Sequence, residues 1–266
     1  MAADSAQNDL QIQLCNYKES VRRNLKDSIN SGEFILLGKL LKMLGKPQFQ
    51  QFTVYYQVKY DFNSKIRGAD FIIVSPKGIF LLESKHWKGV TYIYKGNLDN
   101  WLLFNNPQLK IFGKEKKGKT SLNTRVFNVR ERKGQVCLYS FGKNPVEQVR
   151  EYSSDLASHL KSDSDFVRMR NAFVRNAVVF TNRDNCEIFY NNVPLTIERL
   201  DGCTHLMTDE YIEDFFSTIP PMECDMQKAI NEIDKLNHRA KIDKDNYRQP
   251  PFDLIEPNHI TLEGSH

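Results

Sequence analysis

Two acidic residues and one lysine stand in an otherwise apolar stretch of this sequence. Asp70 lies just before the apolar run 71–74, and Glu83 and Lys85 follow the apolar run 79–82. Charges in segments that are otherwise typical of buried strands cost free energy unless they are paired or bind a metal ion. Carboxylate oxygens suit Mg²⁺ or Mn²⁺. The stretch therefore predicts a functional site that binds a divalent cation.

The residues between the two apolar runs are typical of the turn of a β-hairpin. The turn sequence at 75–78 is Ser-Pro-Lys-Gly, in which proline fixes φ and glycine relaxes the exit. A turn centred between Pro76 and Lys77 pairs residues whose numbers sum to 153, which places Asp70 opposite Glu83. Opposed carboxylates repel each other, and a cation between them would remove the repulsion. A glycine bulge at the end of the turn would instead shift the pairing by one residue.

A helix is expected before the hairpin, with an acidic residue in its first turn. Ser31 is a good N-cap, Gly45 is a good residue for the end of the helix, and the leucines between them recur at helical spacing. Glu33 lies in the first turn. One interpretation is that Glu33 complements the helix dipole. The other is that its carboxylate faces the cation site.

A second helix is expected after the hairpin. Asn144 is a good N-cap, Pro145 suits the first helical position, and the helix is predicted to run to about Leu160. Gln148 and Tyr152 are four residues apart and share a face of this helix. The pair is consistent either with a surface glutamine beside a core tyrosine or with two side chains that face the predicted site.

The other elements predict an α/β fold. The apolar run 176–181 reads as a buried strand, parallel to a neighbour after a helical crossover. Residues 243–261 read as a tail. Further strands are expected at 51–60, 90–94, 101–104, 135–141, 188–190 and 196–200, and further helices at 17–29, 208–219 and 223–239. We expect a mixed central sheet with helices on both faces.

The segment 105–143 is strongly basic. It holds ten lysines and arginines but only two acidic residues, Glu115 and Glu131. One interpretation is a solvated loop. The other is an arm that follows the phosphates of a nucleic acid, because lysine and arginine supply most affinity that is independent of base sequence. The residues that we expect to bind nucleic acid are Lys114, Lys116, Lys117, Lys119, Arg130, Arg132 and Lys133.

Composition narrows the class of protein. The five cysteines are scattered without a CxxC pair, which argues against a disulfide scaffold and a structural zinc site. No apolar run approaches the roughly 18 residues of a membrane span, and no signal-peptide core is present. We expect a soluble cytoplasmic protein. The net charge of +4 permits a nucleic-acid partner without requiring one.

An Asp, a hairpin and then Glu-x-Lys resemble the active site of the PD-(D/E)xK nucleases, and more narrowly the nuclease-related domain (NERD) family. The resemblance covers about residues 31–160 and rests on Gly32-Glu33, Ala69-Asp70, the run from Pro76 to Lys85, Trp87, Gly89, Asn144-Pro145 and Gln148. It implies a restriction-endonuclease-like sheet.

The resemblance also implies roles for individual residues. Asp70 and Glu83, with the backbone carbonyl of Ser84, would bind Mg²⁺ or Mn²⁺, and Lys85 would orient a water or stabilise charge. Glu33 and Gln148 would support the site. The Gln-x-x-x-Tyr pair, which ends at Tyr152, would hold a phosphate or a water on the metal.

We therefore expect an N-terminal helical arm (1–30), a nuclease-like domain (31–219) with a basic insertion (105–143), and a C-terminal helical extension with a tail (220–266). The expected function is metal-dependent hydrolysis of phosphodiester bonds in nucleic acid, with DNA favoured, although the residues do not distinguish DNA from RNA. Two alternatives remain: a nucleic-acid-binding module on the same fold that does not cut, and an adaptor whose basic insertion binds an acidic protein.

Overall fold

The computed structural model describes residues 31–49, 51–62, 65–95, 110–112, 124–132, 135–140, 144–162, 174–182, 186–191, 193–221, 225–242 and 259–261. The expected N-terminal arm at 1–30 and the strand expected at 101–104 lie outside these ranges. The same is true of five residues expected to bind nucleic acid: Lys114, Lys116, Lys117, Lys119 and Lys133.

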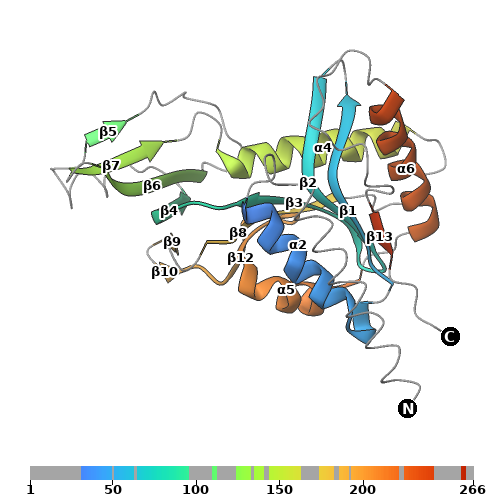
Figure 1. The fold of residues 1–266 in the computed structure, drawn as a ribbon, viewed down its shortest axis with the longest axis horizontal. Helices are drawn as coiled ribbons and strands as arrows, with labels where there is room; N and C mark the ends of the chain where they lie inside the picture. Colours follow the sequence, from blue (N-terminus) through green and yellow to red (C-terminus); the bar gives the residue numbers. More distant parts are fainter. Residues whose placement is uncertain are drawn as a thin grey trace.

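A seven-stranded mixed sheet forms the centre of the molecule (Figure 1), as the sequence predicted. In order across the sheet its strands are β11 (Ile197–Arg199), β12 (Thr204–Thr208), β8 (Val174–Phe180), β3 (Gly78–Lys85), β2 (Lys65–Ser75), β1 (Thr53–Phe62) and β13 (His259–Thr261). The run expected as a parallel strand is β8, which pairs in parallel with both β3 and β12. The other neighbouring strands of this sheet pair antiparallel.

Helices cover both faces of this sheet. On one face lie α2 (Ser31–Leu44) and α5 (Ile212–Thr218), with the short helices η1 (Pro47–Phe49) and η2 (Asp209–Tyr211) nearby. On the other lie α4 (Pro145–Ser162) and α6 (Met226–Ile242).

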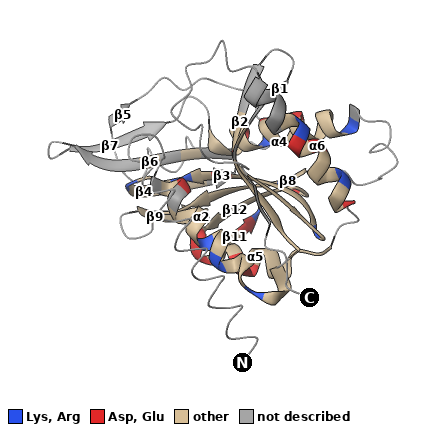
Figure 2. Cartoon of the chain, turned by 45° about the vertical axis from the view of Figure 1, so that its right-hand side comes forward, with Lys and Arg blue, Asp and Glu red and all other residues tan. Residues whose placement is uncertain are grey.

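Strand β3, which carries Glu83 and Lys85, contributes to the hydrophobic cores on both faces of the sheet, because its side chains alternate between the two faces. Phe80 and Leu82 pack with α2 and α5, whereas Ile79 and Leu81 pack with α4 and α6. Among the residues that Figure 2 draws in colour, the charged positions lie mostly on the helices, and the centre of the sheet carries few of them.

A second sheet, which the sequence did not predict, continues from the first. Its strands in order are β10 (Val193–Pro194), β9 (Cys186–Tyr190), β4 (Gly89–Lys95), β6 (Thr124–Arg132), β7 (Gln135–Ser140) and β5 (Lys110–Phe112). Only residues 86–88 separate β3 from β4, so one chain segment passes directly from the first sheet to the second. The sequence analysis expected a single central sheet, and the structure divides the strands between two sheets at this point. The described parts of the basic segment are strands of this second sheet.

Two further expectations about elements need correction. The tail expected at 243–261 contains β13, which pairs antiparallel with β1, and β12 was not predicted at all. The helix expected at 208–219 begins as the 3-10 helix η2, and Thr208 makes no capping hydrogen bond through its side chain. Within the described residues, no helix has the length and apolar character needed to cross a membrane.

Candidate active site

The hairpin of β2 and β3 has the first of the two registers that the sequence allowed, the one without the shift of one residue. Residues whose numbers sum to 153 pair with one another, from Ser75 with Gly78 to Phe71 with Leu82. The Ser75 hydroxyl accepts from the N–H of Lys77 at 3.1 Å and donates to the carbonyl of Gly78 at 3.2 Å. Gly78 has a φ of 111°, a conformation that glycine adopts at little cost. The turn therefore fixes the register by local chemistry.

The turn is also held from outside. Lys77 Nζ donates to the carbonyl oxygens of Phe216 at 2.6 Å and Ser217 at 2.9 Å, near the C-terminal end of α5. Arg175 donates to the carbonyls of Lys77 and Pro220, each at 3.0 Å. This structural role for Lys77 could not be read from the turn sequence, because its partners lie about 140 residues away.

Asp70 lies just outside the hairpin ladder, at its end away from the turn. The pairing of β2 with β3 ends at Phe71 and Leu82, one step before Asp70 and Glu83 would face each other. Asp70 Oδ2 instead accepts from the N–H of Ser84 at 2.7 Å. The Asp70 carboxylate thus accepts the N–H of Ser84 in place of a backbone carbonyl, at the point where the pairing of β2 with β3 ends.

Glu83, Lys85 and Gln148 meet on the face of the sheet that α4 covers. The Glu83 side chain is buried, and its Oε1 lies 2.5 Å from Lys85 Nζ and 2.7 Å from Gln148 Nε2. Alternation along β3 places Glu83 and Lys85 on one face, as predicted. Gln148 was expected to hold a phosphate or a water. Here its amide nitrogen holds the Glu83 carboxylate.

Glu33 acts on the same site from α2, which lies on the opposite face of the sheet. The first turn of α2 approaches the end of β3 very closely. A Cβ on Gly32 would lie 2.6 Å from His86 Cβ, 2.7 Å from Thr181 Oγ1 and 3.0 Å from Ser84 Oγ. Only glycine fits this contact without a shift. The contact explains why a glycine precedes Glu33 in the first turn of this helix.

The acids of the site repel one another. Burial, then the negative charges of Glu83 and Glu33, raise the pKa of Asp70 to about 8, although the Ser84 N–H and Lys85 act in the opposite direction. Glu33 therefore lies within electrostatic reach of Asp70, whether or not it also complements the helix dipole. A cation at this position would relieve the repulsion and lower the pKa of Asp70.

The oxygen atoms present at this site suit a divalent cation whose remaining ligands are water molecules. In the described part of the chain, no three His, Cys, Asp or Glu side chains form a cluster that could hold a metal by themselves. Two carboxylates, Asp70 and Glu83, are present with the backbone of Ser84 between them. The Ser84 N–H points to Asp70, and a residue in a strand directs its N–H and C=O to the same edge. The Ser84 carbonyl therefore faces the Asp70 side, as a backbone ligand would. Mg²⁺ characteristically binds one or two carboxylates and keeps several waters.

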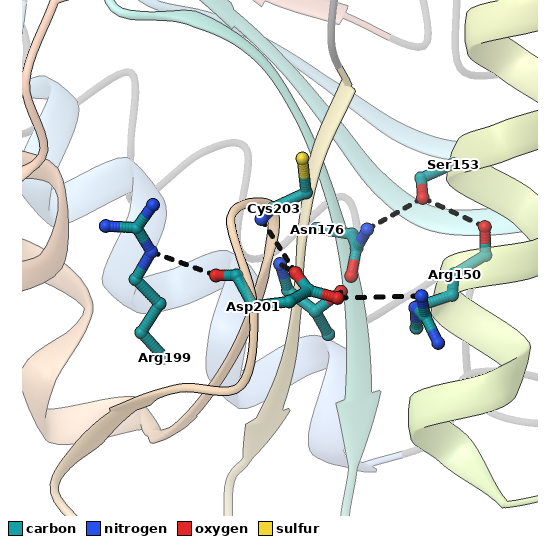
Figure 3. A network of polar contacts seen from close by, with 7 residues as sticks. Arg150, Ser153, Asn176, Arg199, Asp201 and Cys203 are labelled. Atoms are coloured by element: carbon teal, nitrogen blue, oxygen red, sulfur yellow. Dashed lines mark hydrogen bonds and ion pairs between the residues drawn. The ribbon is translucent and has the colours of Figure 1, made fainter. Parts of the chain in front are cut away.

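Helix α4, which carries Gln148, is fixed by its cap and by one contact with β8 further along. Asn144 Oδ1 accepts from the N–H of Val146 at 2.8 Å, which confirms the predicted cap. Asn176 of β8 donates to the Ser153 hydroxyl at 2.7 Å, and that hydroxyl donates to the Arg150 carbonyl at 3.0 Å (Figure 3).

An aspartate at the other end of this network holds the turn between β11 and β12. Asp201 accepts from the N–H groups of Cys203 at 2.7 Å and Thr204 at 2.6 Å, and its Oδ2 lies 3.6 Å from an Arg150 nitrogen (Figure 3). Burial alone would raise the pKa of Asp201, but these N–H groups, the Thr204 hydroxyl and Arg150 together lower it. The sequence analysis missed this cluster.

Three further residues predicted to bind nucleic acid are described only in part. Tyr152 packs partly buried against the core on the α4 side. Arg130 and Arg132 lie in β6, where only their backbone positions are described. His86 lies on the α2 side of the sheet, close to Gly32, with its Nδ1 3.2 Å from Thr181 Oγ1.

Comparison with known proteins adds one finding to this geometry. Searches of curated proteins and of solved structures gave no significant match. The family model of the nuclease-related domain matches residues 30–181, which is more than half of the chain and includes α2, the hairpin, α4 and β8. The chain therefore belongs to the nuclease-related domain (NERD) family.

Proposed function

We propose that this protein is a metal-dependent nuclease that hydrolyses phosphodiester bonds in nucleic acid, with DNA as the favoured substrate. The observation that carries the proposal is the meeting of Asp70, Glu83, Lys85 and Gln148 at the end of one strand. The raised pKa of Asp70 supports it, because a carboxylate strained by like charges is suited to a cation.

In this proposal the metal ligands are Asp70, Glu83 and the backbone carbonyl of Ser84, and the metal is Mg²⁺ or Mn²⁺. When bound, the ion would supply Lewis acidity that activates water and offsets charge on the phosphate. Lys85 supplies a positive charge beside Glu83, where it stabilises negative charge that develops on the phosphate. Gln148 holds the Glu83 carboxylate in place, and Glu33 adds negative charge that favours the cation.

The test is cleavage of linear, circular and single-stranded DNA and of RNA with Mg²⁺, Mn²⁺ or EDTA. Wild type is compared with Glu83→Gln and with Glu210→Gln, an exposed glutamate of η2 that serves as the matched control. We expect metal-dependent cleavage by wild type and by Glu210→Gln, and none by Glu83→Gln. Cleavage that persists in Glu83→Gln would overturn the proposed site.

Metal binding is measured separately, so that a loss of activity can be interpreted. In thermal unfolding, Mg²⁺ or Mn²⁺ should raise the Tm of wild type, because a ligand that binds only the folded state stabilises it. The same ions should not raise the Tm of Asp70→Asn. If no substrate is cut but nucleic acid still binds in EDTA with a steep salt dependence, the non-catalytic binding module replaces the nuclease.

A further inference from the structure

The two faces of the second sheet differ in exposure. Along β4, Thr91 and Ile93 are completely buried, whereas Tyr92 between them is partly exposed. Along β9, Ile188 is buried and Phe189 is partly exposed. Side chains alternate between the faces of a strand. One face of this sheet therefore closes the core on the α4 side, and the other presents aromatic rings.

The rings on the open face are stacked. Tyr92 and Phe189 are direct register partners on β4 and β9, with ring centroids 5.5 Å apart and an interplanar angle of 19°. A pair in the core, Phe80 with Phe216, meets edge to face at 76°. Phe127 of β6 is the register partner of Tyr92 on its other side. Three neighbouring strands thus place an aromatic residue at the same level.

The segment of the chain that contains three strands of this sheet is also strongly basic. The segment 105–143, which supplies β5, β6 and β7, has ten basic and two acidic residues, a net charge of +8. The rest of the chain has 27 basic and 31 acidic residues, a net charge of −4. On the aromatic face itself, the register places Arg125 and Glu131 of β6 on the same side as Phe127, and Glu187 of β9 is an exposed acid on the same face. By its net charge, the segment 105–143 is complementary to a polyanion.

The open face lies close along the chain to the candidate active site. Tyr92 is seven residues beyond Lys85, so their Cα atoms are at most about 25 Å apart. The contribution of β9 lies beyond the segment that the family model matches, which ends at residue 181. The stacked pair is therefore completed by a part of this chain that the family match does not include.

From these observations we infer that the open face of the second sheet binds an unpaired nucleic-acid strand, whose bases extend the stack of Tyr92 and Phe189. Stacking on aromatic rings is tolerant of sequence because every base has a flat π face, and Arg125, on the same face by register, is available for a phosphate contact. Paired bases are already stacked within a duplex and cannot use such rings. The inference rests on the proposed function and specifies its substrate as nucleic acid with a single-stranded segment.

The experiment measures equilibrium binding by fluorescence anisotropy in EDTA, which prevents turnover of the proposed nuclease. The probes are a labelled 20-nucleotide oligothymidylate, the matching oligouridylate, and a duplex of the same length. The proteins are wild type, Tyr92→Leu, Phe189→Leu and the control Tyr92→Phe, which keeps the ring. Circular dichroism and Tm establish that each variant is folded.

We expect Tyr92→Leu and Phe189→Leu each to weaken binding of the single strand about tenfold, and to change duplex affinity less than about twofold. Tyr92→Phe should bind as wild type does, and Glu187→Gln should bind the single strand slightly more tightly. The two single-stranded probes distinguish a deoxyribose from a ribose strand. Unchanged single-strand affinity in both leucine variants, or an equal loss for duplex, would overturn the inference.

A measurement without substitutions covers the case in which a leucine variant does not fold. Ultraviolet crosslinking of a bromodeoxyuridine strand to wild type, followed by peptide mapping, should label residues 89–95 or 186–191. Crosslinks confined to other segments would overturn the inference. The two proposals can be tested separately. If wild type cleaves nucleic acid but Tyr92→Leu binds the single strand as wild type does, only the inference about the stacking face is refuted. If binding depends on the aromatic rings but no cleavage occurs, only the proposed nuclease activity is refuted.

Discussion

Two aspartates at opposite ends of β8 have opposite electrostatic surroundings. Asp201, beside the start of β8, accepts hydrogen bonds from two backbone N–H groups and lies near Arg150, and its pKa is lowered. Asp70 accepts one backbone hydrogen bond beside the strand's other end, and the negative charges of Glu83 and Glu33 raise its pKa. A carboxylate with its partners supplied by the protein holds a structure together. A carboxylate crowded by other acids is suited to a ligand that the protein does not itself supply.

The largest test of this contrast is catalytic. Asp70→Asn and Glu83→Gln should each reduce metal-dependent cleavage by about 10³-fold, because each removes a ligand of the proposed ion. Asp201→Asn should leave the cleavage rate per folded molecule within about twofold of wild type. Initial rates at saturating Mg²⁺ measure all three. A comparable loss in Asp201→Asn would show that the two carboxylates do not differ in role.

The next test is the pH dependence of stability without metal. The pKa of Asp70 is about 8 in the folded state, against about 3.9 in an unfolded chain. The unfolded state therefore releases its proton first, and the Asp70 contribution makes the protein less stable as pH rises from about 4 to 8. Asp70→Asn should remove this trend, and the gap between the two proteins should reach a few kcal/mol at pH 8.

Chemical denaturation in EDTA across this pH range measures the gap. Mg²⁺ should close it in wild type, because the ion offsets the repulsion. Asp201 contributes with the opposite sign: its lowered pKa stabilises the fold above about pH 4, and that stability is lost as pH falls through the folded-state pKa. If wild type and Asp70→Asn show the same pH profile, the repulsion at Asp70 is not significant.

Removing the Asp201 carboxylate should be a smaller, purely structural change. Asp201→Ala leaves the N–H groups of Cys203 and Thr204 without their acceptor, and should cost about 2 kcal/mol of unfolding free energy. Asp201→Asn keeps one acceptor oxygen and should cost about half as much. Denaturation midpoints measure both changes. An alanine variant as stable as wild type would contradict the structural role of this carboxylate.

The smallest expected effect comes from the contact between α2 and the end of β3. Gly32→Ala introduces a Cβ that meets His86 and Thr181 at less than 3.0 Å, so the first turn of α2 must shift and carry Glu33 with it. We expect about a tenfold loss of cleavage rate, or about 1.4 kcal/mol. Gly202→Ala, where a Cβ would meet only one atom at 3.9 Å, is the matched control. Equal rates in both variants would show that the position of Glu33 does not matter.

The sequence was most informative where structure depends on neighbouring residues. The register of the hairpin followed from the Pro76–Lys77 turn, and the start of α4 followed from Asn144 and Pro145. The parallel strand β8 followed from its continuous apolar run. In each case the deciding residues lie within one turn or one strand.

The sequence was least informative where the deciding contact lies far along the chain. The second sheet joins β4 to β6 and β9, and nothing in the local pattern of β4 distinguishes these partners from β3. Arg150 and Asp201 are 51 positions apart and carry no motif. The polar residues of the hairpin were identified from their conflict with the apolar pattern, but the partner of Gln148 required the structure.

The three residues between the sheets have a mechanical consequence. Asn182 donates to the carbonyl of Trp87 at 2.7 Å, Asn128 donates to the carbonyl of Lys88 at 2.9 Å, and the Trp87 ring packs edge to face on Phe180. The joint is thus held by contacts on both sides, which fix the position of β4 relative to the end of β3. A displacement of β4 would therefore also displace Lys85 at the end of β3.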